Sequence, residues 1–235
     1  MNFAHRQKGF SLTEVLLAVG TLAIGMSFVG GTFLVGVHLS TVATERTVAA
    51  SVADEAFAKI QLYGINTSTT GTVPQDQQYL YANSTSMPVE EFAYPSTKIK
   101  ADKQYYWSAL YRPLESSVMD NTTQVTVFIS RKVGSGSAIP VPVQVAVTAV
   151  AGAGNENKLT ITTAGQESYI NAGSTIVANK TGKIYRVLQR DSVTQNTITL
   201  DQPWQEGLND SVWVIQPAAS GRNSCIATYQ KEIRF

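Results

Sequence analysis

The residue types that could do chemistry are concentrated near the start of the chain, where one carboxylate lies inside an apolar segment. The run Lys8-Gly9-Phe10-Ser11-Leu12-Thr13-Glu14 joins a basic leader, residues 1–9, to a long series of apolar residues. Glu14 is the acidic residue within that series. A carboxylate that reached the centre of a bilayer would cost about 2.5–3.5 kcal/mol. Glu14 therefore needs a partner, and the junction around it suggests one.

The rest of the chain lacks the residue sets of the common catalytic sites. Its two histidines are His5 and His38, so residues 39–235 cannot build a Ser-His-Asp triad, a Cys-His pair or a histidine metal site. Cys225 is the single cysteine, which excludes an intrachain disulfide, and its apolar neighbours favour a small buried hydrophobe over a reactive thiol. No nucleophile has a base nearby. We expect a protein that is not an enzyme and needs no metal or cofactor.

Three further patterns have ordinary interpretations. Gly152-Ala-Gly154-Asn-Glu-Asn resembles a phosphate loop only superficially and is interpreted as a flexible linker. Asp201, Glu206 and Asp210 match no calcium-loop spacing and are interpreted as a solvated turn. Tyr105-Tyr106-Trp107 is expected to pack in a sheet rather than form a binding patch. The net charge of +1 lacks the basic excess of nucleic-acid-binding proteins, so no nucleic acid partner is expected.

The apolar segment from Val15 to Val37 carries no formal charge and is long enough to cross a membrane as a helix. At about 1.5 Å per residue it spans roughly 35 Å, against a hydrocarbon core of about 30 Å. A secretory signal peptide has a shorter apolar region, so we expect this segment to be retained. Arg6 and Lys8 place the N-terminus in the cytoplasm and the residues after 40 outside, by the positive-inside rule.

The junction resembles the start of type IV prepilins and type II secretion pseudopilins. The resemblance is carried by Lys8-Gly9-Phe10-Ser11-Leu12-Thr13-Glu14-Val15-Leu16-Leu17-Ala18 and continues in Leu22-Ala23-Ile24-Gly25-Met26. In that family a prepilin peptidase cuts after the glycine and methylates the new N-terminus. The resemblance implies cleavage after Gly9, N-methylation of Phe10 and an assembly role for Glu14.

In such a processed junction, the new N-terminal amine and the Glu14 carboxylate carry opposite charges that can pair. Cleavage creates a positive amine at Phe10, and Glu14 of a neighbouring subunit can pair with it in an apolar filament core. A subunit out of register would leave both charges unpaired, at a cost of several kcal/mol. The resemblance therefore implies a minor pilin or pseudopilin of a type IV pilus or type II secretion-like filament, inserted in the inner membrane. Its partners would be the prepilin peptidase and other pilin or pseudopilin subunits.

The sequence predicts an α+β fold, with a long pilin-like helix packed on an antiparallel sheet and an additional small all-β module. Apolar residues keep helical spacing from Ser40 to Tyr63, so residues 10–64 are expected to form one helix, membrane-spanning to about residue 37. Glu55 and Lys59 form a favourable i,i+4 pair. Residues 65–152 are expected to form a pilin-like head. Its predicted strands are Gln104–Tyr111, Gln124–Lys132 and Val141–Val150.

Residues 155–217 are predicted to be a small β-barrel or sandwich with Trp204 and Trp213 in its core, because short strand candidates recur at regular spacing. The candidates are Leu159–Thr163, Thr175–Ala178, Lys183–Gln189, Thr197–Leu200 and Ser211–Ile215. A C-terminal strand within 222–235 leaves open whether this module is an insertion in the sheet or an appendage. Two alternatives to a structural subunit also stay open: a filament-displayed adhesin that uses residues 155–217, and an unrelated single-pass membrane protein.

Overall fold

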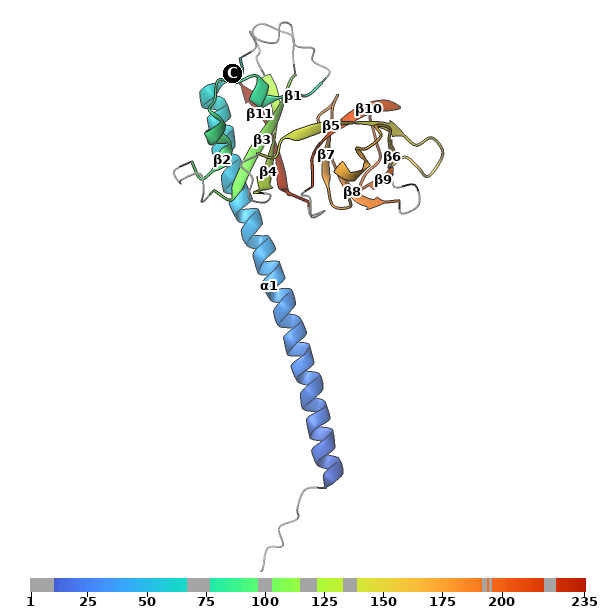
Figure 1. The fold of residues 1–235 in the computed structure, drawn as a ribbon. Coiled ribbons are helices and arrows are strands. Elements are labelled where there is room, and N and C mark those ends of the chain that lie inside the picture. Colours follow the sequence, from blue (N-terminus) through green and yellow to red (C-terminus); the bar gives the residue numbers. More distant parts are fainter. Residues whose placement is uncertain are drawn as a thin grey trace, which may run out of the picture. The chain divides into compact units, whose positions relative to one another are not determined.

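The computed structural model describes residues 11–66, 77–96, 103–114, 122–132, 139–191, 194, 196–217 and 223–235. The chain divides into two units, Met1–Glu45 and Arg46–Phe235. Helix α1, Leu12–Tyr63, runs through both units, and all the strands belong to the second (Figure 1). The predicted helix over residues 10–64 is therefore confirmed to within two residues at its described ends.

The first unit contains the part of α1 that is apolar on every side. Its large side chains are exposed, from Leu12 at 77% to Leu39 at 61%. A helix that is apolar all round is typical of a buried or membrane-spanning segment. Among the described residues, α1 is the helix long and apolar enough to cross a membrane. The expectation of an N-terminal helix that could span a membrane is confirmed for the length and apolar composition of the helix.

The C-terminal turns of α1 belong to the second unit and bury one face. The buried residues follow the predicted spacing of three, four and seven: Ala49, Val52, Ala53, Ala56, Phe57 and Ile60. The helix ends where the sequence predicts. Gly64 takes the left-handed conformation, with φ of +66°, and its N–H donates to the Ile60 carbonyl at 2.9 Å.

A five-stranded antiparallel sheet packs against this face. Its strands lie in the order β1-β3-β4-β11, and β2 pairs with β3 beside β1. Their bounds are Tyr79–Leu80 (β1), Ala93–Tyr94 (β2), Tyr105–Pro113 (β3), Thr122–Arg131 (β4) and Cys225–Arg234 (β11). Alternate residues of β3 and β4, including Trp107, Tyr111 and Val127, join the α1 residues in one hydrophobic core.

Two short 3-10 helices precede β2. They are η2, Tyr81–Asn83, and η3, Val89–Phe92, and they place Tyr81 and Phe92 in the core against Trp107.

The remaining strands form a closed barrel in the order β10-β5-β6-β9-β8-β7. Their bounds are Pro142–Ala149 (β5), Lys158–Ile161 (β6), Thr175–Ala178 (β7), Ile184–Arg190 (β8), Thr197–Leu200 (β9) and Asn209–Ile215 (β10), with a 3-10 turn η5 at Glu167–Tyr169. The prediction that Val141–Val150 completes the sheet on the helix is wrong. That strand forms, but it pairs with β10 and β6 inside the barrel.

The glycine-rich segment at 152–157 is a hydrogen-bonded turn that connects β5 to β6 within the barrel, so its interpretation as a flexible linker is also wrong. Gly152 and Gly154 have φ of +115° and +83°. The turn is held by hydrogen bonds, such as that from Asn155 N–H to the Gly152 carbonyl at 3.2 Å. The Glu156 carboxylate accepts its own backbone N–H and that of Gly154, which lowers its pKa.

The barrel has its own apolar core, filled by inward residues of all six strands such as Tyr185, Leu159 and Val212. The prediction that Trp213 belongs to this core is wrong. Val212 and Val214 point inward, so Trp213 between them points outward and packs with Leu110 and Phe128 of the sheet. Trp204 is half-buried and stacks on Tyr185, with ring centroids 5.0 Å apart.

The C-terminal strand settles whether the barrel is inserted or appended. β11 pairs antiparallel with β4 over its length, and the barrel strands all lie between β4 and β11 in the sequence. The barrel is therefore an insertion in the sheet. The architecture is α+β: one long apolar helix, an antiparallel sheet and a closed six-stranded barrel.

Candidate functional site

The N-terminus of α1 is closed by hydrogen bonds that link Ser11 to the side chain of Glu14 and to the backbone of Thr13. Ser11 precedes the first helical residue, Leu12, and its N–H donates to Glu14 Oε2 at 3.2 Å. Thr13 N–H donates to Ser11 Oγ at 3.3 Å, and the two hydroxyl oxygens lie 2.6 Å apart. The side chains thereby occupy backbone donors that a helix leaves without intrahelical partners.

Glu14 lies in the first turn of α1, where a negative charge is favoured by the helix dipole. Its side chain is exposed, and its carboxylate reaches the backbone nitrogen of the residue that follows Phe10. Gly9 and Phe10 themselves lie outside the described residues.

The polar residues that follow Glu14 in the apolar segment are satisfied within the helix. Thr21 and Ser27 each donate a hydroxyl to a carbonyl one turn earlier, at 2.9 Å, and Thr32 donates to the carbonyls of Phe28 and Val29 at 3.1 and 3.0 Å. These hydroxyls need no water and no partner helix. Because Val15–Val37 has no charged residue, Glu14 is the ionisable group that this surface presents.

The capping arrangement is absent from the predictions above, although its signal is in the sequence. Ser11-Leu12-Thr13-Glu14 matches the Ser-x-x-Glu pattern of a capping box before an apolar run. Read that way, the pattern places the first helical residue at Leu12 and gives Glu14 a partner within its own chain.

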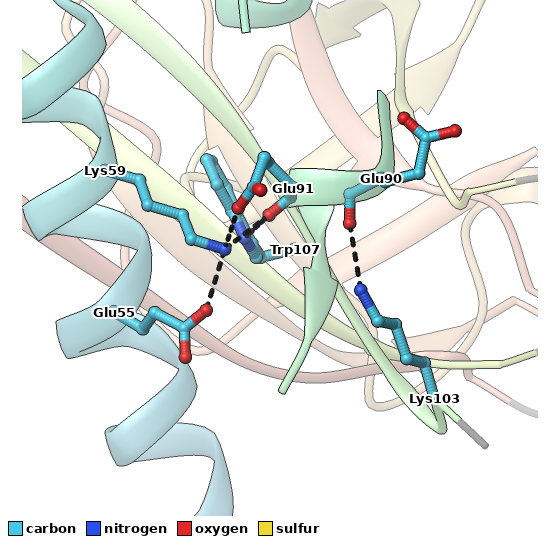
Figure 2. Close-up of polar contacts among 6 residues, drawn as sticks. All are labelled: Glu55, Lys59, Glu90, Glu91, Lys103 and Trp107. Atoms are coloured by element: carbon cyan, nitrogen blue, oxygen red, sulfur yellow. Dashed lines mark hydrogen bonds and ion pairs between the residues drawn. The ribbon is translucent and has the colours of Figure 1, made fainter. Parts of the chain in front are cut away.

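Glu91 of η3 contributes to a second polar site. The sequence predicts the Glu55–Lys59 pair of this site but not the contact with Glu91. The expected pair is present, with Lys59 Nζ 2.7 Å from Glu55 Oε1. Figure 2 shows that Lys59 also reaches Glu91, and that Trp107 Nε1 donates to the Glu91 carbonyl at 3.0 Å. Beside them, Lys103 Nζ donates to the Glu90 carbonyl at 3.3 Å. All of these contacts join protein groups to one another, so this site holds the helix to the sheet.

The three carboxylates of residues 201–210 are not brought together. Asp201 Oδ1 accepts the Arg186 N–H at 3.0 Å, Glu206 accepts the Thr181 hydroxyl, and Asp210 Oδ1 accepts the Ser211 N–H at 2.7 Å. In the part of the chain that the structure describes, no three histidine, cysteine, aspartate or glutamate residues are grouped to hold a metal.

The aromatic candidates pack as the sequence predicts, whereas Cys225 is half-buried and not fully buried as expected. Tyr106 and Trp107 are buried, and Tyr105 packs on the helix-side core. Cys225 lies beside the apolar cluster between sheet and barrel, and burial raises the pKa of its thiol to about 11. The thiol is therefore protonated, and a poor nucleophile, at neutral pH.

Comparisons with protein-family models, with curated proteins and with solved structures find no match for this chain. What the protein does must be inferred from its own residues and their geometry.

Proposed function

We propose that the chain is a minor pilin or pseudopilin of a type IV pilus or type II secretion-like filament. In this proposal a prepilin peptidase cuts after Gly9 and methylates the amine of Phe10. The subunit is held in the inner membrane by α1, with the N-terminus in the cytoplasm and the sheet and barrel outside. Its partners in the filament are other pilin or pseudopilin subunits.

The observation that carries the proposal is the position of Glu14. It is one carboxylate in the first turn of an exposed, membrane-length apolar helix, and its oxygen lies 3.2 Å from the Ser11 nitrogen. Capping alone would be served by an uncharged glutamine. Inside an apolar assembly the charge of a glutamate requires a countercharge. A free amine at Phe10, on the same or a neighbouring subunit, supplies that countercharge.

The C-terminal half of α1 is consistent with a subunit that carries a folded head. It buries one face against the sheet, while the apolar half before it stays exposed. One helix thereby combines an assembly surface with an attachment to the head, as a filament subunit requires. The absence of charge between Val15 and Val37 suits either lipid or a core of neighbouring helices.

The processing step provides the test. The full chain is expressed with a prepilin peptidase, and the N-terminus of the protein purified from membranes is determined by mass spectrometry. The expected result is N-methylated Phe10 for the wild type and a retained leader for Gly9→Val. Gly20→Ala is the matched control, because a Cβ at Gly20 meets nothing within 4 Å. A Gly9→Val terminus as mature as that of the wild type would contradict the proposal and favour an unrelated single-pass membrane protein.

A second candidate function is a filament-displayed adhesin, favoured by the closed barrel with its own core. Ser130 and Cys225, on either side of the insertion, are register partners in neighbouring strands. Residues 142–215 can therefore be replaced by a short Gly-Ser linker, with Leu110→Thr and Phe128→Thr to make the uncovered sheet face polar. Continued assembly with lost attachment would support the adhesin, and unchanged attachment would exclude it.

A further inference from the structure

The sheet and the barrel meet at an apolar patch on the sheet face opposite α1. In β3, Ala109 and Tyr111 point to the helix side, and Leu110 between them packs on the barrel. Leu110 and Phe128 of the sheet contact Val177, Trp213 and Ile215 of the barrel. Two modules joined by connecting segments are expected to move relative to each other unless their interface is extensive. The polar contacts around this patch extend the interface and restrict that motion further.

One turn of the barrel makes three of these polar contacts. It is the turn Asn179–Gly182 between β7 and β8, and it meets side chains or backbone from three parts of the sheet. Gln78 N–H donates to Asn179 Oδ1 at 3.3 Å, Arg112 Nη1 donates to the Lys180 carbonyl at 2.8 Å, and Gln230 Nε2 donates to the Gly182 carbonyl at 2.8 Å. Asn179 Oδ1 also accepts Trp213 Nε1 at 2.8 Å, which connects the turn to the apolar patch.

Gly182 lies too close to the sheet to carry a side chain. Its φ is +72°, and a Cβ built on it would lie 2.3 Å from Gln124 Oε1 and 2.6 Å from Gln78 Nε2. Gln78 is only 3% exposed, and Gln124 Oε1 accepts Arg112 Nε at 3.2 Å. An added Cβ would have to displace the ends of both side chains, and moving Gln124 would disturb its hydrogen bond with Arg112. The turn therefore packs against the sheet so closely that there is no room for one additional methyl group.

We propose that the Asn179–Gly182 turn fixes the barrel to the sheet as one rigid body. The barrel then keeps a constant orientation on the face opposite α1, instead of swinging on the two segments that connect it to β4 and β11. Whatever the barrel contacts is held at a defined orientation relative to the helix that packs on the other face. This inference does not depend on the pilin assignment, since it concerns contacts within one chain.

Distance measurements between two spin labels test the proposal on the full chain in detergent micelles. The labels are placed at Gln61→Cys on α1 and Gln189→Cys on β8, both exposed positions, in a Cys225→Ala background. The expected wild-type result is one narrow distance distribution. In Gly182→Ala we expect the distribution to broaden about twofold or more, because the turn can no longer seat against the sheet.

Gly173→Ala is the matched control. Gly173 is a barrel glycine with φ of +84°, and an added Cβ there meets nothing within 4 Å, so it shares the backbone cost without the clash. Its distribution should stay as narrow as that of the wild type. If Gly182→Ala does not fold, Gln230→Ala replaces it, because it removes one donor to the turn and should also broaden the distribution. A broad distribution in the wild type, or a turn variant as narrow as Gly173→Ala, would overturn the proposal.

Discussion

Lys59 is bound to Glu91 twice: its Nζ lies 2.9 Å from Glu91 Oε2 and donates to the Glu91 carbonyl oxygen, also at 2.9 Å. The third contact of the ammonium is Glu55 Oε1 at 2.7 Å. The ammonium therefore makes one hydrogen bond and two ion pairs, and these contacts join α1 to η3 (Figure 2). Because its side chain is only 11% exposed, the contact fastens the helix to the segment that precedes β2.

Replacing Lys59 with methionine should destabilise the second unit by about 1–3 kcal/mol. The change leaves two neighbouring carboxylates without a countercharge. Breaking a buried pair costs about 3–5 kcal/mol, and the partial exposure of both carboxylates reduces that cost. Urea denaturation of the full chain, followed by tryptophan fluorescence, measures it. Lys180→Met, at an exposed lysine, is the control, and equal stability of the two variants would contradict the role of Lys59.

Only part of this network could be predicted from sequence. Glu55 and Lys59 are four residues apart on a helix, so their pairing follows from helix geometry. Glu91 lies 32 residues from Lys59, and only the tertiary fold brings it there. The barrel shows the same difference between local and long-range prediction. Alternating Val143, Val145 and Val147 predicts a strand. Alternation does not say which strand it pairs with, and the sequence-based prediction therefore places β5 in the wrong sheet.

The error at Trp213 has a related cause. Alternation predicts that Trp213 and its neighbours point to opposite faces of β10, and they do. Both faces are buried, one in the barrel and one on the sheet, so hydrophobicity alone does not tell which face is the barrel interior. At the helix N-terminus the capping box could have been predicted and was missed, because it depends only on residues three apart in sequence.

Two substitutions at the N-terminus of α1 should separate capping from charge. Glu14→Gln keeps a side-chain acceptor for the Ser11 N–H and removes the charge, so processing should continue and filament assembly should fall. Glu14→Ala should behave likewise. Ser11→Ala removes the cap, worth about 1 kcal/mol, and keeps the charge, so assembly should persist. Sheared filaments are quantified by immunoblot, with processing read from the mass of the subunit. Normal assembly of Glu14→Gln would show that the charge is not needed.

Cys225 should make stability fall as the pH rises from about 9 to 11. Burial raises the pKa of the folded thiol from 9.0 to about 11, so between these values the unfolded chain releases a proton that the folded chain keeps. The raised pKa contributes about 2–3 kcal/mol to the free energy of unfolding, and this contribution is fully present below pH 9. It is measured as the difference between wild type and Cys225→Ala in denaturation midpoints across this range. If the denaturation midpoints of the two proteins changed with pH in parallel, the folded thiol would have an ordinary pKa.

Gln78 should be replaceable by methionine with a gain in stability. Its side chain is buried at the contact with Gly182, and within the described residues neither amide atom has a hydrogen-bond partner. A buried polar group without a partner costs about 1–3 kcal/mol, whereas an apolar group of similar shape avoids that cost. The backbone bond from Gln78 N–H to Asn179 Oδ1 is unaffected by the change.

The expected gain is about 1 kcal/mol, measured by urea denaturation of the full chain. Gln61→Met, at an exposed position on α1, controls for the general effect of the substitution and should change little. The gain should vanish in a Gly182→Ala background, because the displaced turn no longer buries the amide. A loss of stability in Gln78→Met beyond that of the control would mean that the amide makes a favourable contact. The polar fit between turn and sheet would then include a bond to Gln78 itself.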